Sequence, residues 1–140
     1  NYLTELAQEL GVADWVEFVG NKRGNELIAY FHLADIYILT PKMVSDMVFE
    51  GFGIVYLEAS ACRKPIIATD AGGVRDAVLD HQTGLIVGDQ DVAGIAGAIE
   101  RLLSDGDLAN RLGAAGYEYA QAHDWPIIVD RFISLYNQYA

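Results

Sequence analysis

The sequence has little basic charge, a single cysteine and no long hydrophobic run. Nine Lys and Arg side chains stand against twenty Asp and Glu side chains, which gives a formal net charge of -11. Such an excess of negative charge repels a polyphosphate backbone, so nucleic acid is excluded as an expected partner. Cys62 has no second cysteine with which to form a disulfide and lies in an apolar run, so we expect a small core residue.

Long apolar segments are also missing. Wholly apolar stretches extend over a few residues, far below the ~20 that a membrane helix needs, and no basic, apolar leader opens the chain. We therefore expect no membrane span and a cytoplasmic location. His32, His81 and His123 are far apart in the sequence and show no metal-ligand spacing. We accordingly predict no metal site and no cofactor.

What is present fits one folded domain. The chain has 140 residues, which suffice for one hydrophobic core and hardly for two. Hydrophobic residues make up 52% and charged residues 21%, as in average soluble proteins, so neither disorder nor a fibrous repeat is indicated. We predict a single domain over residues 1–140.

Hydrophobic periodicity predicts strands that alternate with helices. Residues 65–70 (PIIATD) are almost continuously apolar, which is typical of a strand buried on both faces of a parallel sheet. The predicted fold is therefore an α/β, Rossmann-like, doubly wound parallel sheet followed by C-terminal helices. Strands are predicted at 15–20, 35–40, 65–70 and 83–87, and helices at 3–11, 25–34, 53–62 and in three segments from 91 onward, the last beginning at Asp124. 

Ligands of such sheets lie beyond the carboxyl ends of the strands, in the loops that lead into helices. The loops to inspect follow Val19, Thr40 and Thr69. The loop after Thr40 is long for a strand-to-helix connection, and its residues Met43–Phe49 carry more apolar bulk than an exposed loop usually does.

The stretch EGFGIVYLEASACRKP (residues 50–65) follows that loop and holds two carboxylates eight positions apart, Glu50 and Glu58. The helix is apolar almost all round, which predicts burial and therefore a donor partner for the Glu58 carboxylate. About five residues into the helix, Glu58 stands roughly 7 Å from the helix start, similar to the span from a diphosphate to a ribose diol. A phosphate on the free N–H groups of the helix start would place ribose hydroxyls beside Glu58.

Other interpretations of these residues stay open. Glu58 can instead face solvent, or form an ion pair with Arg63 or Lys64. The glycines of G-F-G allow the backbone to approach a ligand closely, yet a tight turn in which Phe52 fills the core explains them equally well.

The motif E-G-F-G-x-x-x-x-E-A-x-A-C-x-K-P, followed by I-I-A-T-D-x-G-G-V and T-G-L-I-V, resembles the C-terminal, donor-binding domain of retaining GT-B glycosyltransferases of family 4, the glycosyl transferases group 1. The resemblance covers nearly the whole chain. It implies that the full protein moves a hexosyl group from a nucleotide-sugar to an acceptor with retention at the anomeric carbon. The departing diphosphate is expected to help accept the proton of the acceptor.

The resemblance also implies roles for particular residues. Glu58 would bind the ribose hydroxyls, and Glu50, the catalytic candidate, would contact the donor sugar or help stabilise the transition state. The turn after the predicted strand 15–20 is a weaker match to the segment that lines the nucleobase. The expected donor-binding residues are thus the backbone of Gly51, Phe52, Gly53, Ile54 and Val55, the two glutamates, and Gly20, Asn21 and Lys22.

The chain departs from the family pattern in several places. Arg63 stands where a helix-ending Gly is usual, and Arg75 and Asp76 stand where G-G-x-P-E has Pro and Glu. Two upstream strands, with an Arg and a Lys that grip the diphosphate, and an N-terminal acceptor-binding domain have no counterpart here. We therefore expect a fragment of a longer two-domain enzyme that is inactive by itself.

Three rival hypotheses remain. The first is a sugar-nucleotide 2-epimerase of the same fold, which the E-G-F-G motif with Glu58 makes less favourable than a transferase. The second is a non-catalytic α/β module that binds a partner protein through Met43–Phe49. The third, a glycosidase that uses both carboxylates, is weakened because a ribose already explains Glu58.

Overall fold

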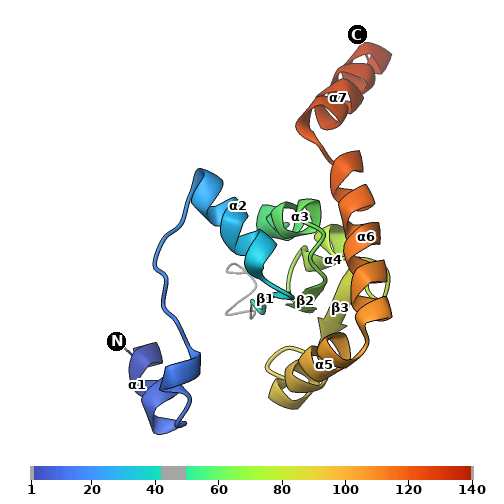
Figure 1. The fold of residues 1–140 in the computed structure, drawn as a ribbon. Coiled ribbons are helices and arrows are strands. Elements are labelled where there is room, and N and C mark those ends of the chain that lie inside the picture. Colours follow the sequence, from blue (N-terminus) through green and yellow to red (C-terminus); the bar gives the residue numbers. More distant parts are fainter. Residues whose placement is uncertain (1, 42–49, 140) are drawn as a thin grey trace.

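The computed structural model describes residues 2–41 and 50–139, and Figure 1 shows their arrangement. Helices and parallel strands alternate up to residue 87, and helices follow to the end. In chain order the elements are α1 (Tyr2–Glu9), the 3-10 helix η1 (Ala13–Trp15), α2 (Gly24–Leu33), β1 (Tyr37–Leu39), α3 (Ile54–Ala61), β2 (Ile66–Thr69), α4 (Val74–Ala77), β3 (Gly84–Val87), α5 (Val92–Ser104), α6 (Gly106–Ala122) and α7 (Trp125–Tyr139).

The described strands form one parallel sheet in the order β1-β2-β3. Tyr37 of β1 lies opposite Ile66 of β2, which in turn lies opposite Gly84 of β3. The predicted α/β fold with a parallel sheet is confirmed. Because the strands are parallel, their carboxyl ends and the loops that follow them meet at one edge of the sheet.

Apolar side chains pack on both faces of the sheet, and β2 is buried along its whole length. Ile66 and Ala68 belong to one core cluster, which α2, α3 and α4 cover. Ile67 points to the opposite face and belongs to a second cluster, which α5 and α6 cover. Successive residues of a strand point to opposite faces, so the continuous apolar run of β2 is what a sheet covered on both sides requires.

Polar caps fix where the two long helices after the sheet begin. The Asp91 side chain accepts a hydrogen bond from Gly94 N at 2.9 Å at the start of α5, and that of Asp105 accepts from Leu108 N at 2.9 Å at the start of α6. Such caps satisfy N–H groups that have no acceptor within the helix. The helices predicted from 91 onward are confirmed with these bounds.

The predicted strand at residues 15–20 is wrong. Ala13–Trp15 form η1, and residues 16–23 run without a strand to α2, in an extended connection that Figure 1 shows standing away from the sheet. A strand needs a hydrogen-bonded neighbour, and β1 pairs with β2 alone among the described strands. The alternating apolar residues of this segment stay outside, with Val16 42% and Phe18 50% exposed.

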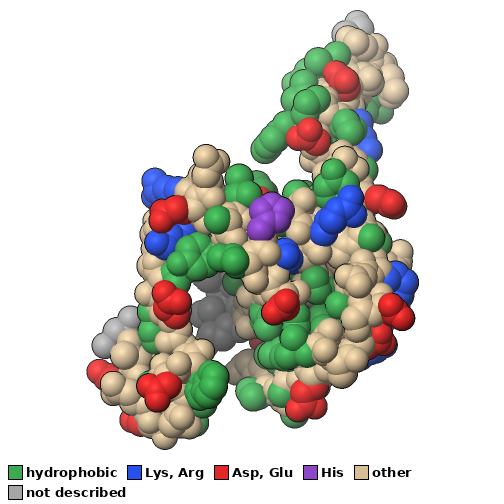
Figure 2. All heavy atoms as spheres, viewed as in Figure 1, with side chains coloured by type: hydrophobic (Ala, Val, Ile, Leu, Met, Phe, Trp, Pro, Cys, Tyr) green, Lys and Arg blue, Asp and Glu red, His purple; other side chains and the backbone are tan. Residues whose placement is uncertain are grey.

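Helix α7 projects from the body of the molecule, and none of its described residues is buried. Figure 2 shows apolar side chains facing outward on this helix. Trp125 at its start is 70% exposed and Trp15 is 89% exposed, so neither is a core residue in this chain. None of the described helices is both long and apolar enough to cross a membrane. 

Candidate functional site

The turn that carries Glu50 lies at the carboxyl edge of the sheet, against the loop that follows β2. Gly73 N donates a hydrogen bond to Glu50 O at 2.9 Å. A Cβ added at Gly73 would lie 1.7 Å from Gly51 O, so the two loops touch backbone to backbone. Thr69 Oγ1 donates to Pro41 O, which ties the end of β2 to the start of the same long loop. Two of the loops predicted to form the ligand edge, those after Thr40 and Thr69, are thus brought together.

Helix α3 begins directly after this turn, at Ile54. Gly53 takes the left-handed conformation with φ 79°, and its carbonyl accepts from Tyr56 N at 2.9 Å. No side chain caps this helix start, so its first N–H groups keep their capacity to bind an external acceptor. Phe52 and Val55 pack against the core cluster, Gly51 is exposed and Gly53 is buried.

The expected burial of Glu58 is wrong, because its side chain is exposed. The buried positions of α3 are Tyr56, Ala59 and Ser60, which share the face toward the body of the domain. Glu58 lies one turn after Ile54, itself 58% exposed, on the opposite face. The apolar composition of the helix therefore does not surround this carboxylate.

Glu58 lies at the border of two surface hollows. One, of about 480 Å³, lies between α2 and α3 and includes Gly24, Phe31 and Cys62 in its lining. The other, of about 460 Å³, lies between α3 and the junction of α6 with α7 and includes His123 and Trp125 in its lining. The carboxylate is thus accessible from either side. No ion pair joins it to Arg63 or Lys64, because Lys64 Nζ donates to His32 O at 3.0 Å and the Arg63 guanidinium lies over the Tyr117 ring at 4.0 Å.

Two tyrosines link α3 to the sheet. The Tyr56 ring packs edge-on against Tyr37 with 6.1 Å between centroids, and Tyr56 Oη donates to Leu39 O at 2.9 Å. Burial is the main cause that raises the pKa of Tyr37, and the charges of Glu58 and then Glu50 add to it. Both tyrosines accordingly stay protonated at neutral pH.

Residues 20–22 are not joined to this turn by any polar contact within the described chain. Gly20 and Asn21 are exposed, and a Cβ at Gly20 would meet nothing within 4 Å. Lys22 Nζ lies 3.3 Å from Glu26 Oε1 and 5.6 Å from the Tyr30 ring centroid, both on the helix that it precedes. In this chain the segment is positioned by α2 alone.

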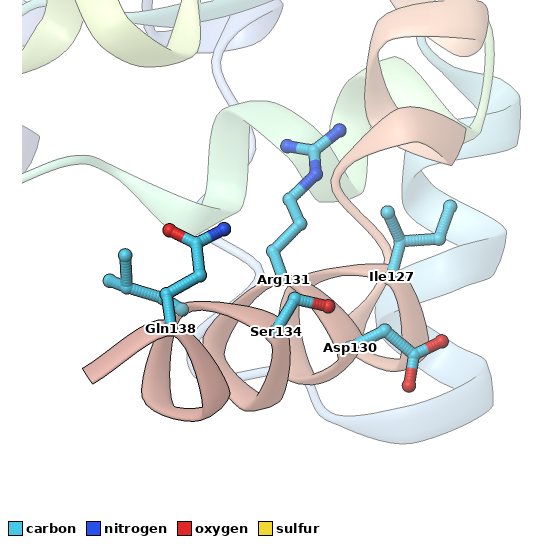
Figure 3. A pocket seen from close by; sticks show the side chains of 6 residues that line it. Ile127, Asp130, Arg131, Ser134 and Gln138 are labelled. Carbon is cyan, nitrogen blue, oxygen red and sulfur yellow. The ribbon is translucent and has the colours of Figure 1, made fainter. Parts of the chain in front are cut away.

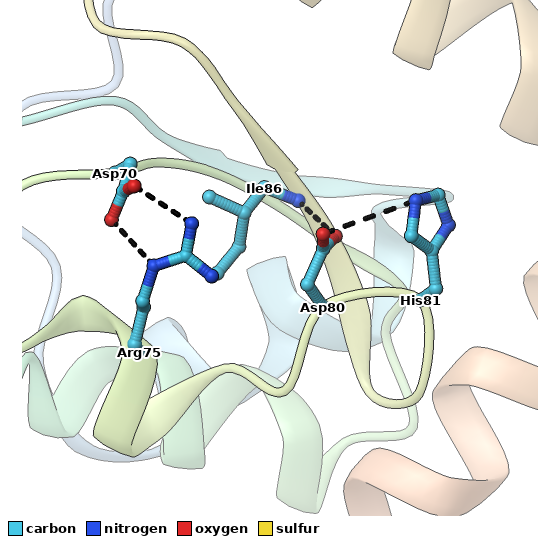
Figure 4. Close-up of polar contacts among 5 residues, drawn as sticks. All are labelled: Asp70, Arg75, Asp80, His81 and Ile86. Carbon is cyan, nitrogen blue, oxygen red and sulfur yellow. Dashed lines mark hydrogen bonds and ion pairs between the residues drawn. The ribbon is translucent and has the colours of Figure 1, made fainter.

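An ion pair that sequence reasoning did not identify closes the loop after β2 (Figure 4). Arg75 Nε donates to Asp70 Oδ1 at 2.8 Å, and Arg75 Nη2 donates to Asp70 Oδ2 at 2.7 Å. A second acidic residue, Asp80, accepts from Ile86 N at 2.9 Å and lies 3.9 Å from His81 Nε2, which holds the loop before β3. The hydrogen bonds from Arg75 are the main cause that lowers the pKa of Asp70.

Replacing Arg75 with alanine is expected to return the pKa of Asp70 to near its ordinary value of 3.8. In the unchanged chain the depressed pKa means that the ion pair stabilises the fold above pH 3.8 and that this stabilisation is lost as the pH falls through the lower folded value. Carboxyl ¹³C titration of Asp70 in both proteins measures the difference. Equal midpoints would contradict the ion pair.

Two further sequence expectations concern other parts of the chain. The apolar loop Met43–Phe49 lies outside the described residues. Among the residues that are described, no group of three or more His, Cys, Asp or Glu side chains is placed to hold a metal ion. A shallow hollow on α7 is lined by residues of that helix, as the side chains labelled in Figure 3 show. It therefore lies on the surface of α7 and is not part of this site.

Sequence reasoning missed the residues that support the turn rather than those expected to touch a ligand. In the sequence Tyr56 is one position of an apolar helix, and only the rule that a buried tyrosine needs a partner for its hydroxyl could have identified it. The sequence does not indicate that Asp70 and Arg75 pair, because a bidentate contact across a glycine loop depends on the loop conformation. Gly73 was visible in the D-x-G-G motif, but its contact with Gly51 joins residues on different loops.

The parallel sheet, the glycine turn at its carboxyl edge and the uncapped helix start define an α/β domain whose candidate ligand edge lies at the carboxyl ends of the strands. Residues 1–119 match the sequence profile of the family described as Glycosyl transferases group 1. The chain belongs to this family.

Particular relatives agree with this assignment. The chain is 42% identical over 121 residues to a GDP-mannose-dependent alpha-(1-6)-phosphatidylinositol monomannoside mannosyltransferase of Mycobacterium tuberculosis, covering 86% of this chain and 31% of that protein. It is similar to the sucrose-phosphate synthase structure of Thermosynechococcus elongatus, with 36% identity, a TM-score of 0.82, and 97% of this chain and 33% of that one covered.

A third comparison identifies which part of such proteins the chain matches. The crystallised C-terminal domain of a glycosyl transferase group 1 family protein from Francisella tularensis is 26% identical, with a TM-score of 0.70 over 86% of this chain and 60% of that one. The chain thus corresponds to the C-terminal domain of a GT-B glycosyltransferase, and it spans about a third of the length of the first two relatives.

Proposed function

We propose that this chain is the nucleotide-sugar donor-binding part of a retaining glycosyltransferase that transfers a hexosyl group. The observation that carries the proposal is the turn of Glu50 to Gly53, which contains exposed Gly51 and leads into an uncapped helix start, with exposed Glu58 one turn further on. A family match over residues 1–119 supports it.

In the proposed complex each part of the donor meets a different group. The diphosphate accepts hydrogen bonds from the free N–H groups at the start of α3, where the helix dipole also favours negative charge. The ribose hydroxyls donate to Glu58, which lies roughly 7 Å from the helix start. The exposed carboxylate needs no rearrangement to be reached, because hollows open on both sides of it.

We expect Glu50 to act at the sugar end of the donor. Its carbonyl accepts a hydrogen bond from Gly73 N, and its side chain is proposed to contact sugar hydroxyls or to help stabilise the transition state. In the proposed reaction the bond from the anomeric carbon to the diphosphate breaks and the bond to the acceptor oxygen forms on the same face. The acceptor proton passes to the departing diphosphate, and no metal is required.

The rest of the enzyme is proposed to supply the acceptor site and the cations that grip the diphosphate. The chain spans 31% of the mycobacterial relative, so most of such a protein lies elsewhere. Exposed apolar side chains on α7 and in residues 15–18 are surfaces that this remainder would cover. We expect the isolated chain to show no transfer activity, and a cytoplasmic location stays a prediction.

The experiment that tests the proposal is a titration of the chain with GDP, UDP and ADP by ligand-observed NMR, with EDTA present. One nucleotide is expected to bind saturably. Glu58→Ala is expected to weaken it about tenfold, because hydrogen bonds to a charged group are lost at an exposed site. Glu118→Ala removes the same charge from an exposed position of α6 and is the matched control, expected to bind like the unchanged chain.

Two outcomes would overturn the proposal. Failure of all three nucleotides to bind would favour the non-catalytic partner-binding module. Binding that Glu58→Ala leaves unchanged would remove the ribose role of this residue. Since a relative is named for its dependence on GDP-mannose, GDP is the first nucleotide to test.

A further inference from the structure

The loop after β2 contains few residues that restrict its backbone conformation. Gly72 takes a positive φ of 60°, and Gly73 follows it, so the backbone here is intrinsically permissive. Helix α4 begins at Val74 and is only 4 residues long, too short to be stable without tertiary contacts. One end of the loop is fixed, because Asp70 N donates to Val87 O at 3.1 Å at the end of β3.

The other end of the loop is fixed by a side chain. Arg75, in the first turn of α4, reaches back to Asp70 with two hydrogen bonds of 2.8 and 2.7 Å, in the forked geometry that suits a guanidinium and a carboxylate. The ion pair thereby closes a ring that contains Ala71, Gly72 and Gly73. Figure 4 shows that the pair spans from the end of β2 to the start of α4.

The middle of this ring supports the Glu50 turn. Gly73 N donates to Glu50 O at 2.9 Å, and the Gly73 Cα faces Gly51 O so closely that a Cβ would lie 1.7 Å from it. If the loop moves, the backbone of Glu50 and Gly51 must therefore move with it.

We propose that Asp70 and Arg75 are positioning residues for the donor sugar: their ion pair holds the Gly73 loop, which in turn fixes where the Glu50 carboxylate stands. The pair itself touches no reacting atom. Its effect is expected at the sugar end of the donor, through Glu50, and not at the nucleotide end, where Glu58 and the start of α3 act. This inference rests on the proposed function.

The test compares binding of a nucleotide-sugar with binding of the same nucleotide without its sugar, because the ion pair is expected to affect only the sugar end of the donor. Affinities for GDP and GDP-mannose, and for UDP and UDP-glucose, are measured by calorimetry for the unchanged chain, Arg75→Ala, Asp70→Asn and the double variant. We expect each single change to weaken the nucleotide-sugar about fivefold, near the upper end for an exposed ion pair, and to leave the free nucleotide unchanged. The double variant is expected to match the single ones, because either change removes the same contact.

Arg111→Ala removes an exposed arginine of α6 and controls for the loss of one positive charge. A second readout needs no ligand: exchange of the Gly73 amide proton, followed by NMR, is expected to be faster in Arg75→Ala and unchanged in Arg111→Ala. Equal weakening of nucleotide and nucleotide-sugar, or no weakening of either, overturns the positioning role. If the unchanged chain binds neither member of either pair, the proposed function fails and this inference fails with it.

Discussion

Replacing Gly73 with alanine is expected to destabilise the domain by about 1–3 kcal/mol, the usual cost of extra volume at a packed site. The added Cβ would lie 1.7 Å from Gly51 O and 2.9 Å from Gly51 C. Both are backbone atoms, so no side-chain rotation relieves the overlap. The hydrogen bond from Gly73 N to Glu50 O must lengthen or break, and the Glu50 turn must move.

Urea unfolding of Gly73→Ala measures the loss of stability, and titration with a nucleotide-sugar measures the displacement of Glu50. Gly97→Ala is the matched control, because the same methyl group on α5 would meet nothing within 4 Å. There alanine is expected to stabilise the helix by up to about 1 kcal/mol. An unchanged unfolding midpoint for Gly73→Ala would show that the loops after β1 and β2 do not touch as described.

The elements that the sequence predicted well are those with strong local signals. Residues 65–68 are apolar without a break, and β2 is buried on both faces. Asp91 and Asp105 precede the apolar periods of α5 and α6, and each caps its helix. In these places the local preference and the tertiary environment agree, so a single sequence is sufficient.

The predicted strand at 15–20 is wrong because strand formation requires a neighbouring strand, which the local sequence does not specify. The alternation of Val16, Phe18 and their neighbours gives the right pattern, but a strand exists only with a hydrogen-bonded neighbour. The described chain offers none beside this segment, and Phe18 remains 50% exposed. Among the described residues, no polar contact joins residues 20–22 to the Glu50 turn, and their role at the nucleobase stays a prediction.

The burial of Glu58 failed for a different reason. Composition showed that α3 is apolar almost all round, but it did not show which face has a neighbour. Tyr56, Ala59 and Ser60 lie against the body of the domain, whereas Ile54 and Glu58 lie on the face that remains open. The spacing argument survives, since the distance along a helix does not depend on burial.

The contacts that hold the Glu50 turn in place were the hardest part of the site to predict from the sequence. The rule for parallel sheets predicted that the loops after Thr40 and Thr69 share an edge, and Gly73 N bonded to Glu50 O confirms it. The rule does not give the contact distance, which decides that Gly73 has no room for a side chain. Nor does it indicate that Asp70 and Arg75 pair across the loop.

Tyr56 is the residue whose truncation is expected to have the largest effect in the described chain. Its ring is fully buried, lies edge-on to Tyr37, and occupies the space directly beneath Gly53, where a Cβ would meet the ring at 2.5 Å. Removing a buried aromatic side chain costs about 3–5 kcal/mol. Tyr56→Ala is therefore expected to lose much of the stability of a domain of this size and to release the turn that Gly53 ends.

A phenylalanine at the same position separates the two contributions of Tyr56. Tyr56→Phe keeps the ring beneath Gly53 but leaves Leu39 O without the hydroxyl that donates to it at 2.9 Å, so we expect a loss of about 1–2 kcal/mol. Because burial raises the pKa of the Tyr56 hydroxyl, it remains a donor throughout the neutral range. Urea midpoints measure both variants, with Tyr136→Ala, at a position of α7 that is 78% exposed, as the control.

The two variants also distinguish what the ring does for the site. If the ring sets the position of the Glu50 turn, Tyr56→Phe binds nucleotide-sugar like the unchanged chain, whereas Tyr56→Ala loses binding even under conditions in which it remains folded. If the hydroxyl bond to Leu39 sets that position, both variants lose binding equally. The first result is expected, because Gly53 and the ring are in direct contact, while Leu39 lies on the strand before the long loop. A Tyr56→Ala protein as stable as Tyr136→Ala would contradict the packing beneath the turn.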